Sequence, residues 1–285
     1  MQLLNAMVQG ILLGGLYALF AAGLSLIFGV MKIVNIAHGD LIVVAAYMAY
    51  FVIQATGLGP FEALILVIPA AALIGYALQR GLINFTLGSE LPPLLVTISL
   101  SIIIQNALLL GYTADVHRLQ AGDIEIASWT LAPDFSIGVL PVIQFAVAVA
   151  VIGGLQLLFY RTSFGRAFRA TSDDAEVAQL MGLDTRHIFA LAMALSLAVV
   201  AVAGVFIGVR TNFNPFSGPQ LLIFGFEAVI IGGLGSLWGT LAGGILLGVA
   251  QAIGGQISVG LPFTAGHVLF FVVLLLRPSG LFART

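Results

Sequence analysis

Long apolar stretches separated by short polar breaks form the dominant pattern of this chain. Their residues do not alternate between apolar and polar, so they predict helices and not the alternating segments of about ten residues that build a membrane barrel. A helix satisfies its own backbone hydrogen bonds in lipid, and roughly 20 apolar residues cross a bilayer. We therefore expect membrane spans at about residues 5–31, 41–54, 61–78, 94–112, 138–160, 188–209 and 261–276, with a further long apolar region at 221–257.

Composition supports a membrane location for these helices. Apolar residues make up 60% of the 285 residues and charged residues 8%, whereas soluble domains contain roughly 45–50% and about 25%. We predict an all-α polytopic membrane protein with about eight transmembrane helices. Residues 1–285 are expected to form a single transmembrane domain. The absence of cysteine excludes a disulfide framework and a thiolate metal site, and no basic patch indicates nucleic acid.

The apolar region 221–257 poses a problem of topology. It is too long for one ordinary span and short for two full ones, since a helix rises about 1.5 Å per residue. We expect a broken or re-entrant hairpin that turns near residues 232–236, because irregular backbone at membrane depth is tolerated when protein surrounds it. This hairpin also returns Arg277 to the side that carries the other basic residues.

The basic residues also give an orientation. Residues 161–187 hold four of the ten basic residues and four of the twelve acids, and basic residues accumulate on the cytoplasmic side of a membrane protein. We therefore place 161–187 in the cytoplasm. Counting the spans then places Lys32 and Arg80 inside too, and the N-terminus and the acidic loop 113–136, which includes Asp134, outside.

The cytoplasmic segment 161–187 has the pattern of a short helix between two spans. Thr171-Ser172 followed by three acids predicts a helix over residues 172–181, because hydroxyl caps and acids favour a helix N-terminus, and Gly182 fits a left-handed end. Such a helix either simply joins two spans or docks a cytosolic motor. The residues that we expect to make a motor contact are Gly165, Arg166, Arg169, Asp173, Asp174, Glu176, Ala178 and Gly182.

Five stretches resemble one transporter family. Glu176-Val177-Ala178-x-x-x-Gly182 is similar to the E-A-A-x-x-x-G loop of permeases in ATP-binding-cassette (ABC) importers, with Val177 in place of the middle alanine. The opening stretches 14–30 and 35–40 resemble the start of branched-chain amino-acid permeases. Residues 231–244 and 276–282 resemble the end of the same proteins. The similarity covers nearly the whole chain and is to the smaller permease subunit of the high-affinity importers, with urea and short-amide permeases closely related.

The resemblance implies an importer subunit that is not an enzyme and works with several partners. These are a second homologous permease subunit, two cytosolic ATPase subunits, a periplasmic substrate-binding protein and the lipid bilayer of the bacterial inner membrane. The chain contains no G-x-x-x-x-G-K-[ST] phosphate loop, so we expect it to bind no cofactor, with ATP and magnesium on the ATPase subunits. The alternatives are import of urea or short amides and, in a different class, a stand-alone secondary transporter.

A polar cluster, Asn35, His38 and Asp40, precedes the second span. Two potential ligands with no third nearby make a poor metal site. The cluster caps a helix and bonds backbone carbonyls, or it lines a gate or a translocation path.

Other polar residues lie inside the apolar runs. Glu227 is the only acid deep within one, so it marks a functional site or reaches the outer interface to pair with headgroups or with Arg210. Thr97, Ser101 and Gln105, with Asn106, recur at about one helical turn and form a polar stripe that bonds helices together or lines a wet path. The translocation-path candidates are Asn35, His38, Asp40, Thr97, Ser101 and Glu227.

Overall fold

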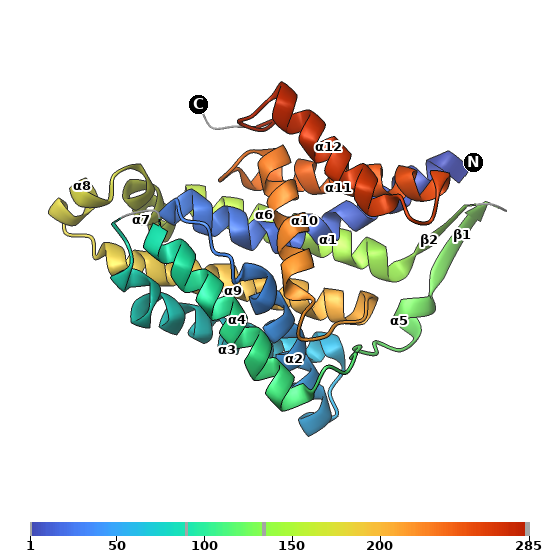
Figure 1. Ribbon diagram of the computed structural model, residues 1–285, viewed down its shortest axis with the longest axis horizontal. Helices are drawn as coiled ribbons and strands as arrows, with labels where there is room; N and C mark the ends of the chain where they lie inside the picture. Colours follow the sequence, from blue (N-terminus) through green and yellow to red (C-terminus); the bar gives the residue numbers. More distant parts are fainter. Residues whose placement is uncertain (1, 89–90, 133–134, 283–285) are drawn as a thin grey trace.

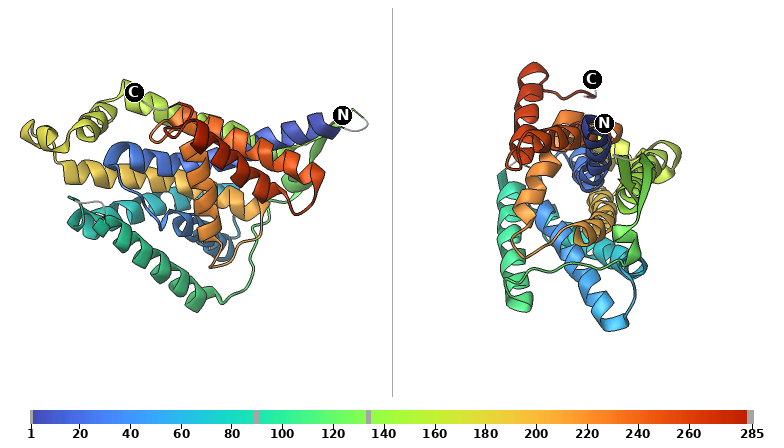
Figure 2. Two further views of the ribbon diagram at one scale, coloured as in Figure 1. Left: turned by 45° about the horizontal axis from the view of Figure 1, so that its top comes forward. Right: turned by 90° about the vertical axis from the view of Figure 1, so that its right-hand side faces the viewer.

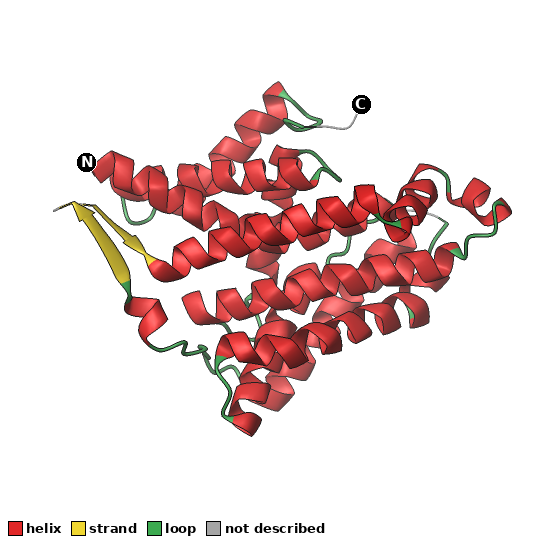
Figure 3. Ribbon diagram, turned by 180° about the vertical axis from the view of Figure 1, so that it is seen from behind, coloured by secondary structure: helices red, strands yellow, loops and turns green. Residues whose placement is uncertain are grey.

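The computed structural model describes residues 2–88, 91–132 and 135–282, and these are mainly helical (Figures 1 and 3). The long helices are α1 (Gln2–Met31), α2 (His38–Thr56), α3 (Pro60–Gly81), α4 (Leu91–Tyr112), α6 (Val139–Arg161), α9 (Thr185–Arg210) and α11 (Leu237–Ile257). The shorter elements are η1 (Ile83–Phe85), α5 (Asp123–Ile126), β1 (Ser128–Ala132), β2 (Phe135–Gly138), α7 (Ser163–Asp173), α8 (Ala175–Leu180), α10 (Gly218–Gly232) and α12 (Pro262–Leu276).

The span predictions are confirmed by these helices. Within the described residues, seven helices are long and apolar enough to cross a membrane, and α10 and α12 are shorter apolar helices of 15 residues each. The predicted hairpin in 221–257 exists as α10 and α11, with the turn at residues 233–236. Several helices begin three residues earlier than expected, and at α2 this takes His38 and Asp40 into the first turn.

The long helices form a bundle with distinct ends (Figure 1). The α7–α8 segment lies at one end, and the N-terminus and the β1–β2 hairpin lie at the other. Figure 2 shows α4 along the margin of the bundle. Ser172 in α7 donates a 2.6 Å hydrogen bond to the carbonyl of Gly29, and Arg80 lies 3.6 Å from Asp184. The basic regions that the sequence assigns to one side of the membrane therefore share one end of the structure.

Helices α1 and α11 pack through glycine. A Cβ on Gly10 would lie 2.7 Å from the Cα of Val249, and a Cβ on Gly248 would lie 2.6 Å from the backbone nitrogen of Gly14. Real side chains do not fit at such distances. Small residues let two membrane helices approach closely enough for extensive van der Waals contact, which drives helix association in lipid. The Gly10-x-x-x-Gly14 spacing therefore marks the contact with α11.

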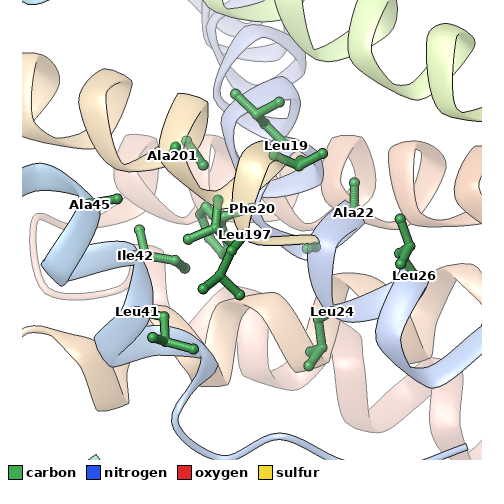
Figure 4. Packing of buried hydrophobic residues seen from close by; sticks show 14 of the residues in the cluster. Leu19, Phe20, Ala22, Leu24, Leu26, Leu41, Ile42, Ala45, Leu197 and Ala201 are labelled. Carbon is green, nitrogen blue, oxygen red and sulfur yellow. The ribbon is translucent and has the colours of Figure 1, made fainter. Parts of the chain in front are cut away.

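The buried apolar core lies between α1, α2 and α9 (Figure 4). Leu19 and Phe20 of α1 and Ile42 of α2 are almost fully buried, with Leu197 of α9 beside them. Close packing of these side chains is the main source of cohesion in a membrane, where lipid is as apolar as the core.

The turn after α10 is closed by residues far away in the sequence. The backbone N–H of Leu281 donates to the carbonyl of Ile231 (2.9 Å), and that of Phe282 donates to Gly232 (3.0 Å). These carbonyls end α10 and need donors, because a helix leaves its last carbonyls without partners. A Cβ on Gly29 would lie 3.3 Å from the Cα of Gly235, so the turn also packs against the end of α1.

The predicted outer loop 113–136 contains more structure than the sequence indicates. It holds α5 and most of an antiparallel hairpin, β1–β2, in which Trp129 pairs with Ile137. His117 and Phe213 exchange two backbone hydrogen bonds of 2.9 Å, which tie the loop to the chain after α9. Asp134 lies outside the described residues.

Candidate functional site

The segment 161–187 contains two short helices and not one. The prediction of a single helix over residues 172–181 is wrong, because α7 ends at Asp173 and α8 begins at Ala175. The predicted caps are also wrong: Thr171 is buried within α7, and Ser172 bonds Gly29 of α1. The actual caps are Thr162, whose hydroxyl accepts from the backbone N–H of Gly165 at 3.1 Å, and Asp174.

Asp174 both ends one helix and starts the next. Its side chain accepts from the backbone N–H groups of Glu176 (2.9 Å) and Val177 (3.0 Å), which have no partner within α8. At the other end, Gly182 adopts φ 86° and the N–H of Leu183 bonds the carbonyl of Ala178 at 3.0 Å. This is the expected left-handed helix end, so the prediction for Gly182 is confirmed.

The α7–α8 segment presents both charge and apolar surface. Among the predicted contact residues, Arg166, Asp173, Asp174, Glu176 and Gly182 are exposed, whereas Gly165 and Ala178 are buried. The tip of α8 also exposes Val177, together with Leu180 at 87% and Met181 at 79%. Exposed apolar side chains beside charged ones are typical of a contact surface for another protein.

The arginines of α7 face different surroundings. Arg169 is half-buried: its guanidinium donates to the carbonyl of Phe159 and lies 5.1 Å from the ring centre of Tyr160. This contact holds α7 against the end of α6. Arg166 is exposed. Of the two, Arg166 is the one available to a partner.

Asp184 caps the N-terminus of α9 beside this segment. The hydrogen bond from the backbone N–H of His187, 3.1 Å long, lowers the pKa of the Asp184 carboxyl below its usual value, and the Arg80 guanidinium acts in the same direction. The ion pair is exposed to solvent, so it contributes little stability by itself.

A second candidate site surrounds Asp40, in the first turn of α2. Its carboxylate accepts from the Ser101 hydroxyl (2.5 Å) and from the Gln105 amide (3.0 Å), both on α4. The Thr97 hydroxyl accepts from the backbone N–H of Ile36 at 3.2 Å. The predicted stripe therefore holds α4 onto the start of α2. Asn106 is not part of it, since its amide bonds the carbonyl of Ile102 in the same helix.

The neighbours of Asp40 bond the backbone. His38 Nε2 lies 2.9 Å from the carbonyl of Phe20, so this nitrogen carries the proton that it donates. The Asn35 side-chain oxygen accepts from the N–H of Ala37 at 3.0 Å. Phe20 is roughly 16 Å from the C-terminal end of α1, because a helix rises about 1.5 Å per residue. Since His38 contacts Phe20, the segment between α1 and α2 runs back into the bundle before α2 begins.

Glu227 has a different partner from the one expected. Its Oε1 accepts from Nδ1 of His267 on α12, while Arg210 bonds the side chain of Gln144 at 3.1 Å. The predicted pair with Arg210 is therefore wrong. The carboxylate is 5% exposed and the imidazole 41%. Because α10 starts beside Asp40 inside the bundle, Glu227 lies in the bundle and does not reach an interface.

Aromatic rings surround the Glu227–His267 pair. The Phe224 ring stacks on Phe263 (5.4 Å) and on the His267 imidazole (6.2 Å), and it also lies 5.4 Å from Tyr17. Tyr17 is near the middle of the 30-residue α1. The pair is therefore at membrane depth.

Sequence reasoning missed His267 and the Tyr17–Gln251 hydrogen bond of 2.5 Å. The sequence does mark His267 as a candidate functional residue, because it is the single ionisable residue within the last apolar run. Its partner could not be read from the sequence, since Glu227 is 40 residues away. Among the described residues, no three metal-binding side chains gather in one place.

Comparisons with known proteins identify the family of this chain. The family model described as "Branched-chain amino acid transport system / permease component" matches residues 6–277. The chain is 31% identical to the high-affinity branched-chain amino acid transport system permease protein BraD of Pseudomonas aeruginosa, covering 99% of this chain and 96% of that protein. It is 29% identical to LivH, a permease of the same description from Escherichia coli K12, with the same coverage. It is also 31% identical to the fructose import permease protein FrcC of Rhizobium meliloti, over 86% of this chain and 74% of that protein.

The fold has a counterpart among solved structures. PsaBC from Streptococcus pneumoniae, solved in complex with Fab, superposes with a TM-score of 0.51 at 16% identity, covering 98% of this chain and 92% of that one. This likeness concerns the fold alone. The family model matches nearly the whole chain, and seven helices among the described residues are long and apolar enough to cross a membrane. The chain is therefore a multi-pass membrane protein that belongs to the family of branched-chain amino acid transport permeases.

Proposed function

We propose that this chain is a permease subunit of an ABC importer that carries branched-chain amino acids across the bacterial inner membrane, and that α7–α8 is its contact with a cytosolic ATPase. The observation that carries the proposal is the tip of α8, where Leu180 and Met181 are exposed outside the bundle beside charged residues. A partner that covers this apolar tip stabilises it by removing it from water.

The chain contributes no nucleotide site to this assembly. Its one lysine, Lys32, follows Met31 and not the glycine of a phosphate loop. ATP and magnesium belong to two separate ATPase subunits, which act on α7–α8. A second, homologous permease subunit completes the translocation route, and a periplasmic binding protein delivers substrate to the opposite end, near residues 113–136.

Contacts at the α7–α8 end offer a route for the motion. Ser172 bonds the carbonyl of Gly29, and Gly29 packs against Gly235 in the turn that ends α10. A displacement of α7 is therefore applied directly to α1 and to the α10–α11 turn. The N-terminus of α10 packs in turn against Asp40, so α10 joins the coupling end to the Asp40 cluster.

Two functions compete with this one. Import of urea or a short amide uses the same architecture and differs in cargo. A secondary transporter needs ion-coupling carboxylates within its spans; Asp40 has both oxygens bonded by α4, which leaves Glu227 alone for that task. We therefore favour an ATP-driven importer.

Reconstitution tests the proposal. Proteoliposomes that contain this chain, its companion permease, the ATPase subunits and the binding protein are expected to accumulate radiolabelled leucine only with ATP inside. Leucine flux without ATP would point to a secondary transporter. ATP-driven uptake of urea and not leucine would reassign the cargo.

A matched pair of variants tests the contact. Leu180→Asp places a charge on the exposed apolar tip of α8 and is expected to reduce co-purification of the ATPase subunits by at least tenfold. Ile126→Asp makes the same change at an exposed position of α5, at the opposite end, and is expected to leave co-purification unchanged. Equal retention of the ATPase by both variants would place the contact elsewhere.

A further inference from the structure

We propose that Glu227 and His267 form a membrane-depth binding site for the ammonium group of an amino-acid substrate. This inference rests on the proposed transport function and adds the polar group of the cargo that the site takes. Three observations support it: the Glu227 oxygen that has no hydrogen-bond donor, the exposure of His267 and the aromatic rings around both.

The Glu227 carboxylate has unused capacity for hydrogen bonds. Oε1 accepts from His267, whereas Oε2 is buried and bonds no group in the described part of the chain. A buried carboxylate oxygen without a donor is unfavourable, and ionisable side chains inside a membrane mark substrate and ion pathways. An ammonium group brings three donors and a positive charge, which match this oxygen.

Asp40 shows that not every deep carboxylate here is a ligand site. Both of its oxygens accept hydrogen bonds, from Ser101 and from Gln105, and its side chain is buried among α2, α4 and α10. Each Asp40 oxygen therefore already has a donor within the protein, whereas Glu227 Oε2 has none. The contrast assigns Asp40 to packing and Glu227 to binding.

His267 gives the site access from outside the bundle. Its side chain is 41% exposed although α12 lies against the middle of the bundle through Phe224. A half-exposed imidazole is unfavourable against hydrocarbon, and such side chains face a water-filled cavity or another protein. Of these two alternatives, we assign the exposed side of His267 to the translocation route.

The surrounding rings suit a cation attached to an apolar side chain. Phe224 and Phe263 stack at 5.4 Å beside the imidazole, and the face of an aromatic ring attracts an ammonium group. The ring of Phe263, which is 49% exposed, also offers apolar surface to a branched aliphatic side chain. A neutral cargo such as urea gains no ionic attraction from the carboxylate, so the site favours amino acids over amides.

A double variant separates binding from structure. Glu227→Leu/His267→Leu removes both partners at once, so neither side chain is left buried and unpaired. We expect it to assemble with the ATPase subunits in the same amount as the wild type, while leucine uptake by proteoliposomes falls at least tenfold. The control is Gln79→Leu/Asn84→Leu, which removes another buried polar pair, linked at 2.9 Å, and is expected to change uptake less than twofold.

Wild-type uptake by the Glu227→Leu/His267→Leu variant would overturn the inference. It would leave the proposed function intact, because the wild-type complex would still import leucine with ATP. Absence of leucine uptake by the wild-type complex would instead refute the proposed function.

Cysteine labelling tests access independently of transport. The chain has no cysteine, so His267→Cys and Ile103→Cys, an exposed position on α4, each introduce a single thiol. A charged, membrane-impermeant methanethiosulfonate reagent is expected to modify His267→Cys at least tenfold faster than Ile103→Cys. Equal rates at the two positions would place His267 against lipid and overturn the inference.

Discussion

The centre of the bundle and the α7–α8 end use the same residue types for opposite physical reasons. Gly14 lies where a Cβ would collide with the backbone of α11, whereas Gly182 has open space around it and adopts φ 86°. Asp40 is buried and accepts a side-chain hydrogen bond on each oxygen, whereas Asp174 is exposed and caps α8. At the centre, the residue type is determined by the space between helices and by buried hydrogen bonds. At the α7–α8 end, it is determined by backbone conformation and by helix capping in solvent. Changes at Gly14 and Asp40 should therefore destabilise the whole bundle, whereas a change at Gly182 should have a local effect.

The largest expected effect is at the α1–α11 contact. Gly14→Val places three carbons where backbone atoms of Ile245 lie, so α1 and α11 must separate. Overpacking costs about 1–3 kcal/mol or more, and we expect at least a tenfold loss of assembled protein in detergent extracts. Gly153→Val on α6 is the control, since nothing lies within 4 Å of its Cβ position. Similar yields of the two variants would show that α1 and α11 tolerate separation.

Asp40→Ala comes next. It leaves the Ser101 hydroxyl and the Gln105 amide without their shared acceptor, which costs about 1–3 kcal/mol for buried groups. Circular dichroism in detergent should show a lower thermal midpoint, with α4 the first helix to gain hydrogen exchange. Asp40→Asn keeps one acceptor oxygen and should lose less than half as much. A midpoint equal to that of the wild type for Asp40→Ala would show that the α4 contacts add nothing.

Gly182→Ala should produce a smaller and local effect. Alanine at positive φ costs about 1–2 kcal/mol, so amide exchange at Leu183 should rise roughly 5- to 30-fold while the global midpoint stays unchanged. Gly111→Ala on α4 is the matched control, because that glycine also has open space but no positive φ. A global loss of stability in Gly182→Ala would contradict the separation of the two regions.

The smallest effect is the pH response of Asp184. Its pKa is lowered in the folded state, so its contribution to stability is present above the usual pKa of an aspartate and is lost as pH falls through the lowered value. The thermal midpoints of the wild type and of Asp184→Asn should therefore differ at neutral pH and converge in strong acid. A difference that persists in acid would show that the charge on Asp184 does not matter.

Much of the fold could be predicted because each span carries its own signal. Apolar runs of helix length predicted the spans. The α10–α11 hairpin was predicted because the apolar run 221–257 is interrupted by glycines and because two crossings return Arg277 to the side of the other basic residues. The choice of capping residue is harder to predict, because five neighbouring side chains can all cap a helix: Thr162, Thr171, Ser172, Asp173 and Asp174. Only a contact distant in sequence, such as the bond of Ser172 to Gly29, shows that a candidate is used elsewhere. Pairings between distant residues, such as Glu227 with His267, depend on how α10 lies across the bundle, which no local pattern records.

The closure of the α10–α11 turn has a consequence for biosynthesis. Ile231 and Gly232 receive their donors from Leu281 and Phe282, which the ribosome adds 50 residues later. Until those residues have emerged, the carbonyls at the end of α10 lack these partners in a mostly apolar environment. A chain truncated just after Arg277 should therefore insert its helices into the membrane. The last carbonyls of α10 should still lack these hydrogen-bond donors, which leaves that end of the helix accessible to quality-control proteases.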